Sequence, residues 1–370
     1  MASAYATKIA EGFSNRLMKE VYDKSLTDTV VNRDYEGEIN EVGSKLNILN
    51  FARISEKDYD GSDLTADSLF ENNAVLTIDQ YKSFYWKEKT LDRWLSYIEN
   101  PHATVVQQKS DERNKNMDEY VFGQYGDVAS GNRVGTDHTD GTVTVDVTTG
   151  VVTGSSSNFT SAMVGRGFKA TGHTTWYRVK SYSSATSIVI EDDLDDVTSA
   201  YTGGAIAGGT TYTIEAVTPL ALTTSNVLAQ IGQMKLKLDL AEKNGKSSVP
   251  TQDRWLIAPP EFEDLITNGA TGITLHVPEV YEMLVKKGMV TMLKGFKVFI
   301  SNRLTGNNTD GYRLLAGHGN WCTFAEKLLT SDMEEDLQGN FGSAYKDLFV
   351  YGAKVTDSRR HFATEGFFTF

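Results

Sequence analysis

Two runs of β-type composition, 46–54 and 74–81, stand out in the hydrophobic pattern of this chain. They flank a polar tip near residues 58–63, so they predict the two strands of an extended β-ribbon. At about 3.3 Å per residue the first run alone spans roughly 30 Å. A lone two-stranded ribbon is marginally stable in water, so we expect a neighbouring subunit to cover it. The candidate intersubunit contacts in the ribbon are Leu46, Ile48, Phe51, Leu76, Ile78 and Tyr81.

Two further segments show helical periodicity. In residues 7–20, Ile9, Phe13 and Leu17 recur at helical spacing, which predicts a short amphipathic helix that docks on another surface. These three residues are also candidate intersubunit contacts. Residues 91–125 are mainly helical in pattern, with Pro101 at the start of a new helix.

The middle of the second helical segment, residues 107–116, is almost wholly polar. Such a helix is either solvated or lies against a polar partner. Its basic residues could contact phosphates of DNA. These DNA-facing candidates are Lys109, Arg113 and Lys115. Acidic residues lie among them, and a mixed solvated face is the favoured interpretation.

The composition changes near Gly131. Residues 135–215 are rich in Thr, Ser, Gly and Val, and their short alternating runs are separated by turn signals. This pattern predicts an all-β domain of roughly 80 residues, large enough to fold alone. Because helical patterns precede and follow it, we interpret it as a domain inserted into a host fold.

The remainder alternates helices and strands. A helix is predicted from Ser225 to Gly245, and a buried strand over residues 254–258 leads into a helix over residues 261–268. The predicted strands that follow cover residues 296–300, 312–316, 321–325, 348–355 and 360–370. The host is therefore predicted to be α+β.

Composition limits the functional classes. The chain has 370 residues and a formal net charge of −13, which argues against broad binding to nucleic acid or to membrane surfaces. No apolar run approaches the roughly 18 residues that span a bilayer. The single cysteine, Cys322, excludes an internal disulfide framework and is interpreted as a small buried hydrophobe.

Signatures of catalysis and cofactor binding are absent from the sequence. It contains no nucleophile elbow, phosphate-binding loop or dinucleotide fingerprint, and its six histidines lack metal-ligand spacing. The acidic residues 191–196 could hold calcium, but a solvated loop is favoured because the spacing of a calcium loop is missing. Residues 334–336 could supply paired carboxylates for acid–base chemistry, and an exposed turn is the favoured interpretation. We therefore predict no catalytic residue, no metal ligand and no cofactor.

Several short motifs occur in a recognisable order. They are NRDYEGE at 32–38, GSKLNI at 43–48, LTIDQYKSF at 76–84, RWLIAP at 254–259, GFKVFISN at 295–302 and YGAKV at 351–355. In this order they resemble the major capsid proteins of tailed bacteriophages, which have the Hong Kong ninety-seven-type fold. Residues 141–213, with NFT at 158–160 and MVGR at 163–166, resemble small β-domains of phage structural proteins.

The resemblance implies an α+β capsid-type fold with an N-terminal arm, an extended β-hairpin loop, a long spine helix and an inserted all-β domain. The implied organisation is an N-terminal arm (1–40), extended loop (41–90), spine helix and peripheral domain (91–134), inserted β-domain (135–215), peripheral-domain helix (216–250), axial domain (251–340) and C-terminal strands returning to the peripheral domain (341–370).

The function implied by the resemblance is a coat protein. Copies would assemble in the host cytoplasm into hexamers and pentamers of an icosahedral shell, and the virion would enclose double-stranded DNA that the shell contacts weakly. A separate scaffolding protein and a portal are the expected partners, with no membrane. The chain would not be an enzyme.

One alternative function stays open at this stage. The β-domain could bind carbohydrate or another surface, with Trp176 and Tyr177 stacking on sugar, although a place in the β-core is favoured for both residues.

Overall fold

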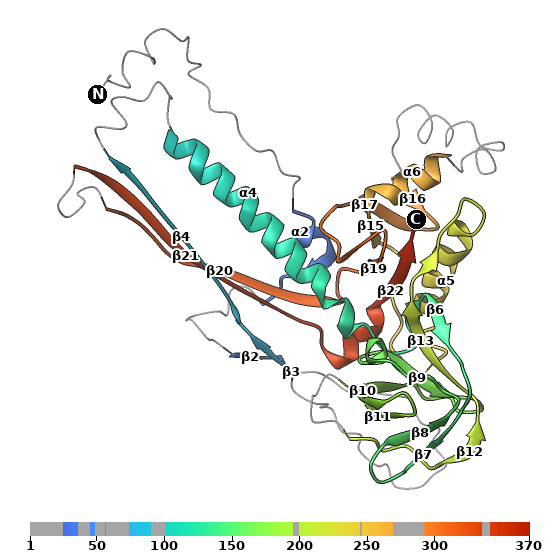
Figure 1. Cartoon of the computed structure of the whole chain (residues 1–370). Coiled ribbons are helices and arrows are strands. Elements are labelled where there is room, and N and C mark those ends of the chain that lie inside the picture. Colours follow the sequence, from blue (N-terminus) through green and yellow to red (C-terminus); the bar gives the residue numbers. More distant parts are fainter. Residues whose placement is uncertain are drawn as a thin grey trace, which may run out of the picture.

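The computed structural model describes residues 25–35, 45–48, 56, 74–89, 101–194, 200–244, 246–268, 292–334 and 341–370. Helices and strands are mixed along the chain, which confirms the predicted α+β class. The predicted helix at residues 7–20 and the predicted ribbon tip at 58–63 lie outside the described residues. Figure 1 shows a long arm that reaches away from a compact body, with a separate group of strands below the body.

The arm consists of a long sheet and the helix α4 (Pro101–Phe122), which runs beside it (Figure 1). The sheet has the strand order β1-β20-β21-β4. Its long strands pair antiparallel, and β1 pairs parallel with the first two residues of β20. The strand bounds are Val31–Asn32 for β1, Gln80–Lys89 for β4, Cys322–Glu334 for β20 and Gly342–Lys354 for β21. Pro101 begins α4 as predicted, because proline is well accommodated in the first helical turn.

The base of the predicted ribbon is present as an antiparallel hairpin of β2 (Lys45–Ile48) and β3 (Ala74–Thr77). The predicted return strand is not continuous. It ends at Thr77, and Gln80 begins β4 in the long sheet of the arm. The hairpin packs through a small apolar cluster against that sheet. The ribbon therefore lies on its own chain at this point.

The body is built around an eight-stranded sheet, in which six strands follow the order β14-β22-β19-β15-β17-β16. Off this path, β18 (Gly306–Asn307) pairs with β19 and β5 (Arg133–Val134) pairs with β22. The bounds of the six strands are Leu220–Ala221 for β14, Arg254–Ala258 for β15, Met292–Leu293 for β16, Phe296–Ile300 for β17, Gly311–His318 for β19 and Ala363–Thr369 for β22. The helices α5 (Val227–Asp239) and α6 (Pro260–Asn268) share its large hydrophobic core. The strands β15 and β17 have the predicted bounds.

A third unit, which we call the β-module, spans residues 136–218. Its eight strands form one sheet with the order β12-β7-β8-β11-β10-β9-β13-β6 and enclose a hydrophobic core of their own. The strand bounds are Thr136–His138 for β6, Thr142–Val145 for β7, Val151–Ser155 for β8, Gly167–Ala170 for β9, Tyr177–Ser184 for β10, Ser187–Asp192 for β11, Ile206–Thr210 for β12 and Tyr212–Thr218 for β13. The predicted end at residue 215 was too early, because β13 continues its ladder with β6 to Thr218.

Two other predicted boundaries differ from the structure. The division between residues 340 and 341 falls between β20 and β21, which pair with each other over the length of the arm. The last strand, β22, pairs with β19 and β14 in the body. Val30 and Val31, assigned by prediction to an outlying N-terminal arm, are buried in the main core.

No helix in the described ranges is long and apolar enough to cross a bilayer.

Candidate functional site: the groove between α4 and the long sheet

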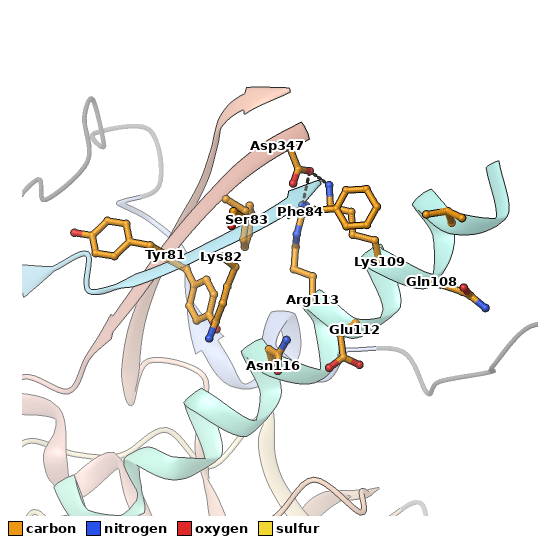
Figure 2. A pocket seen from close by; sticks show the side chains of 13 residues that line it. Tyr81, Lys82, Ser83, Phe84, Gln108, Lys109, Glu112, Arg113, Asn116 and Asp347 are labelled. Carbon is orange, nitrogen blue, oxygen red and sulfur yellow. Dashed lines mark hydrogen bonds and ion pairs between the residues drawn. The ribbon is translucent and has the colours of Figure 1, made fainter. Parts of the chain in front are cut away.

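A groove of about 740 Å³ lies where α4 passes over β4 and β21. Aromatic and charged side chains from the three elements line it together (Figure 2). The lining residues are Tyr81, Lys82, Ser83, Phe84, Val105, Gln108, Lys109, Glu112, Arg113, Asn116, Asp347, Phe349 and Tyr351. Its size falls in the range of about 300–1,000 Å³ that is usual for ligand and peptide sites.

The polar middle of α4 faces this groove. Lys109 and Arg113 lie one helical turn apart and both pair with Asp347 of β21, with Arg113 Nη2 3.2 Å from the carboxylate (Figure 2). The same two cations lie over the rings of Phe84 and Phe349, at 5.0 and 4.0 Å from the ring centroids. The helix is therefore held on the sheet by ion pairs and cation–π contacts where an apolar stripe would be expected.

Positive charge exceeds negative charge in the groove. Lys82, Lys109 and Arg113 line it, and Asp347 is the carboxylate placed between the last two. The second lining carboxylate, Glu112, lies 3.9 Å from Lys115 outside the groove. Burial lowers the pKa of Lys109, assisted by the neighbouring Arg113. A further anionic group at this place would be stabilised electrostatically.

The body end of α4 is fixed by a buried carboxylate. Asp118 is fully buried, pairs with Arg303 and accepts a hydrogen bond of 2.6 Å from the hydroxyl of Thr27. Close by, the hydroxyl of Tyr120 donates to Asp79 at 2.9 Å. Burial, followed by this hydrogen bond, raises the pKa of Tyr120 well above its usual range. These contacts hold the end of α4 that lies against the body.

The structure gives two of the three DNA-facing candidates a partner within the chain, and contact with DNA stays a prediction. The side chains of Lys109 and Arg113 are only 20% and 22% exposed and are used within the chain, so they do not present free charge to phosphates. Sequence reasoning missed Asp347 because it lies 234 residues from Arg113. Lys115 is more exposed and lies beside Glu112, which agrees with the mixed solvated face.

The ribbon residues divide into two groups. Ile48, Leu76 and Ile78 are buried against Ala325 and Val350 of the long sheet. For these three, the expectation that a neighbouring subunit must cover them is wrong, because the chain's own arm does so. Leu46 is partly buried at the edge of the same cluster.

Other intersubunit candidates have different surroundings. Tyr81 is 46% exposed at the rim of the groove, and its hydroxyl donates to the carbonyl of Ile78 at 2.7 Å. It keeps apolar surface that another chain could cover. The remaining candidates, Ile9, Phe13, Leu17 and Phe51, lie outside the described residues.

Exposed apolar side chains gather along the arm. Tyr85 is 56% exposed on β4, and Met333 is 53% exposed near the end of β20. Phe341, just before β21, is 88% exposed. Single exposed apolar residues are ordinary, but a series of them on a protruding element indicates an interaction surface.

A second charged cluster lies at the junction between the β-module and the body. Glu365 of β22 is fully buried and contacts three guanidinium groups, with distances of 2.8 Å to Arg166, 2.8 Å to Arg313 and 3.1 Å to Arg133. Burial alone would raise the pKa of Glu365, but the three arginines outweigh it and lower the pKa. Because Arg166 belongs to the β-module, this cluster fastens the module to the body.

Glu215 of β13 extends the junction. It is buried and accepts a hydrogen bond of 2.8 Å from the backbone N–H of Gly131, with Arg133 3.4 Å away. Burial raises its pKa despite the opposing charges of Arg133 and Lys237. The only signal in the sequence for either glutamate is a carboxylate inside an apolar strand pattern.

Three of the acidic residues proposed as a calcium site are engaged by protein groups, and residues 195 and 196 lie outside the described ranges. Glu191 contacts Arg178 at 2.7 Å, Asp192 accepts from the Thr202 hydroxyl at 2.6 Å, and Asp193 pairs with Arg360 at 2.8 Å. Across the ranges that the structure describes, no group of three His, Cys, Asp or Glu side chains could hold a metal ion.

Cys322 is fully buried, as predicted, and burial raises the pKa of its thiol to about 12.

The proposed sugar platform is not present. Tyr177 is 8% exposed and packs in the β-module core against Tyr201, with ring centroids 4.8 Å apart. Trp176 is partly buried, and Lys169 lies over its ring. The two aromatic rings are therefore not a joint open surface.

No protein-family model matches the chain, and no curated protein matches it. Several solved structures are similar to the chain. A structure from Mycobacterium phage Che8 has a TM-score of 0.59 and 15% identity over 96% of both chains. The capsid structure of cyanophage P-SCSP1u has a TM-score of 0.57 and 13% identity, covering 99% of this chain and 95% of that one. The capsid of Ralstonia phage GP4 has a TM-score of 0.53 and 12% identity, covering 100% and 98%. The chain therefore has the fold found in these phage structures.

Proposed function

We propose that the chain is the major capsid protein of a tailed bacteriophage, a structural protein without enzymatic activity. The observation that carries the proposal is the likeness to phage capsid structures over almost the whole of this chain and of theirs. A fold alone does not fix a function, so the exposed surfaces of the arm provide the second support.

The arm suits repeated contact between copies. It projects from the body (Figure 1). It also bears exposed aromatic and sulfur-containing side chains, including Tyr85, Met333 and Phe341. Stable subunit interfaces typically bury about 2,000 Å² or more, mostly around such anchors. Many modest contacts that close by symmetry can stabilise a shell.

The assembly that we propose has hexamers and pentamers in an icosahedral shell around double-stranded DNA. A chain with a net charge of −13 would contact DNA weakly. A separate scaffolding protein and a portal are proposed partners, with assembly in the host cytoplasm and a final place in the virion.

Negative-stain electron microscopy of the expressed chain tests the proposal. We expect closed particles or capsomer-sized rings, with the chain produced alone and together with a scaffolding partner. A chain that remains monomeric under both conditions, by analytical ultracentrifugation at high concentration, would contradict the proposed function.

A further inference from the structure

The far end of the arm has properties opposite to those of the groove. We call Asp332, Met333, Glu334 and Phe341 the arm tip. Met333 and Phe341 are 53% and 88% exposed, and the two carboxylates beside them are also exposed. The arm tip is thus an apolar projection with negative charge. The groove is an aromatic-lined hollow with an excess of positive charge.

The arm tip cannot fill the groove of its own chain. Phe341 lies six residues from Asp347 along one strand, so about 20 Å separate them at 3.3 Å per residue. The strand that connects them is paired on both sides, with β4 and β20, and cannot fold back. The groove can therefore receive an arm tip only from another copy.

We propose that the arm tip of one copy docks into the groove of the next copy. Phe341 would bury its ring against the exposed Tyr81 and the partly exposed Phe84. A buried aromatic side chain removes about 150–250 Å² from water, which makes it a suitable anchor. Asp332 would lie near Lys82 and supply the anionic group that the groove favours.

This contact joins two different surfaces of the same protein, so it is heterologous. Each copy offers one arm tip and one groove, and repetition of the contact closes a ring or continues across a shell. The inference rests on the proposed function and names the partner of the groove within it.

Engineered cysteines test the contact directly. Asn116→Cys places a thiol in the groove, and Ser343→Cys places one near Phe341; the native Cys322 is buried and does not interfere. In oxidised particles of the double variant we expect a ladder of disulfide-linked chains on a non-reducing gel. The matched control combines Asn116→Cys with Thr153→Cys, an exposed position in the β-module, and should give no ladder.

The outcomes separate the two proposals. Particles without a ladder in the first variant, or with an equal ladder in the control, overturn the docking proposal and leave the proposed function standing. If the unaltered chain stays monomeric both alone and with a scaffolding partner, the proposed function fails. Cross-linking of the concentrated soluble chain then decides the docking proposal alone, since a ladder supports it and no ladder overturns it.

If the two cysteine substitutions themselves prevent assembly, an exchange of charges between the groove and the arm tip tests the contact instead. Lys82→Asp places like charges together and should lower particle yield by about tenfold or more. Adding Asp332→Lys restores the opposite charges and should restore the yield. A double variant that assembles no better than Lys82→Asp alone overturns the docking proposal.

Discussion

The body and the arm each contain a carboxylate surrounded by cations, and the two clusters differ in their access to solvent. Glu365 at the junction is fully buried among Arg133, Arg166 and Arg313. Asp347 in the arm pairs with Lys109 and Arg113, whose side chains stay about one-fifth exposed beside an open groove.

The difference shows that one kind of interaction serves two purposes. At the junction, three arginines share one buried glutamate, and Arg166 of the β-module thereby joins the module to the body. In the arm, two cations share one carboxylate and a third, Lys82, lies nearby. The arm cluster positions α4 and also leaves positive potential in a hollow that another chain can enter.

Replacement of Glu365 should lower the free energy of unfolding more than any other change considered. Glu365→Gln removes the carboxylate shared by Arg133, Arg166 and Arg313, of which Arg133 keeps Glu215 nearby, and should lower the free energy of unfolding by about 3–5 kcal/mol. Chemical denaturation monitored by circular dichroism measures this change. Glu112→Gln, in the groove lining but with a side chain that is 48% exposed, is the matched control and should change it by less than about 0.5 kcal/mol. An equal loss of unfolding free energy in the two variants would show that the buried cluster at Glu365 is no more important for stability than an exposed carboxylate.

Acidification should affect the body through His361. Burial lowers the pKa of His361 to about 4, while the unfolded chain titrates near 6.5. Between pH 6.5 and 4 the unfolded state takes up the proton first, so the unfolding free energy falls as pH falls, at most about 1.4 kcal/mol per pH unit and about 3 kcal/mol in all. His361→Gln should flatten this slope, and the exposed control His173→Gln should retain it. Identical slopes in both variants would exclude His361 as the cause.

Removal of the arm carboxylate should have a smaller effect than removal of Glu365. Asp347→Asn leaves Lys109 and Arg113 partly hydrated, so we expect a loss of about 1–2 kcal/mol in thermal or chemical unfolding. A loss as large as that of Glu365→Gln would show that the arm cluster is as tightly desolvated as the junction.

The smallest effect on folding is expected on the outer face of the arm. Tyr85 is 56% exposed, so Tyr85→Ser should change the unfolding free energy by less than about 0.5 kcal/mol. The yield of particles in sedimentation should nevertheless fall, because the proposed function places this surface between copies. Normal yield would show that Tyr85 stays exposed in the assembly.

Local pattern predicted much of the fold. Periodicity and flanking prolines identified β15, β17, α6 and the start of α4, because the signals for these elements are contained in adjacent residues. The all-β character of the β-module was also evident in its composition. The bounds of β20 and β21 were underestimated, since their outer halves carry mixed polar and apolar residues that only the pairing of the two strands explains.

The candidate site was less predictable. Lys109 and Arg113 were identified as unusual, but their partner Asp347 lies on a strand more than 200 residues away in sequence. The ribbon residues Ile48 and Ile78 were correctly identified as needing cover. The source of that cover, Ala325 and Val350, comes from long-range pairing that a single sequence does not reveal.

The fixed end of α4 gives the arm a mechanical property. The helix has 22 residues and is anchored at Asp118, so it is a stiff rod about 33 Å long with its pivot near the body. From Asp118 to Pro101 the helix covers about 26 Å, so a tilt of about 10° at that pivot moves the other end by about 4–5 Å. In the proposed shell, small rotations there would let identical subunits meet at different angles, so that a closed surface of uneven curvature could be tiled without any change inside the body.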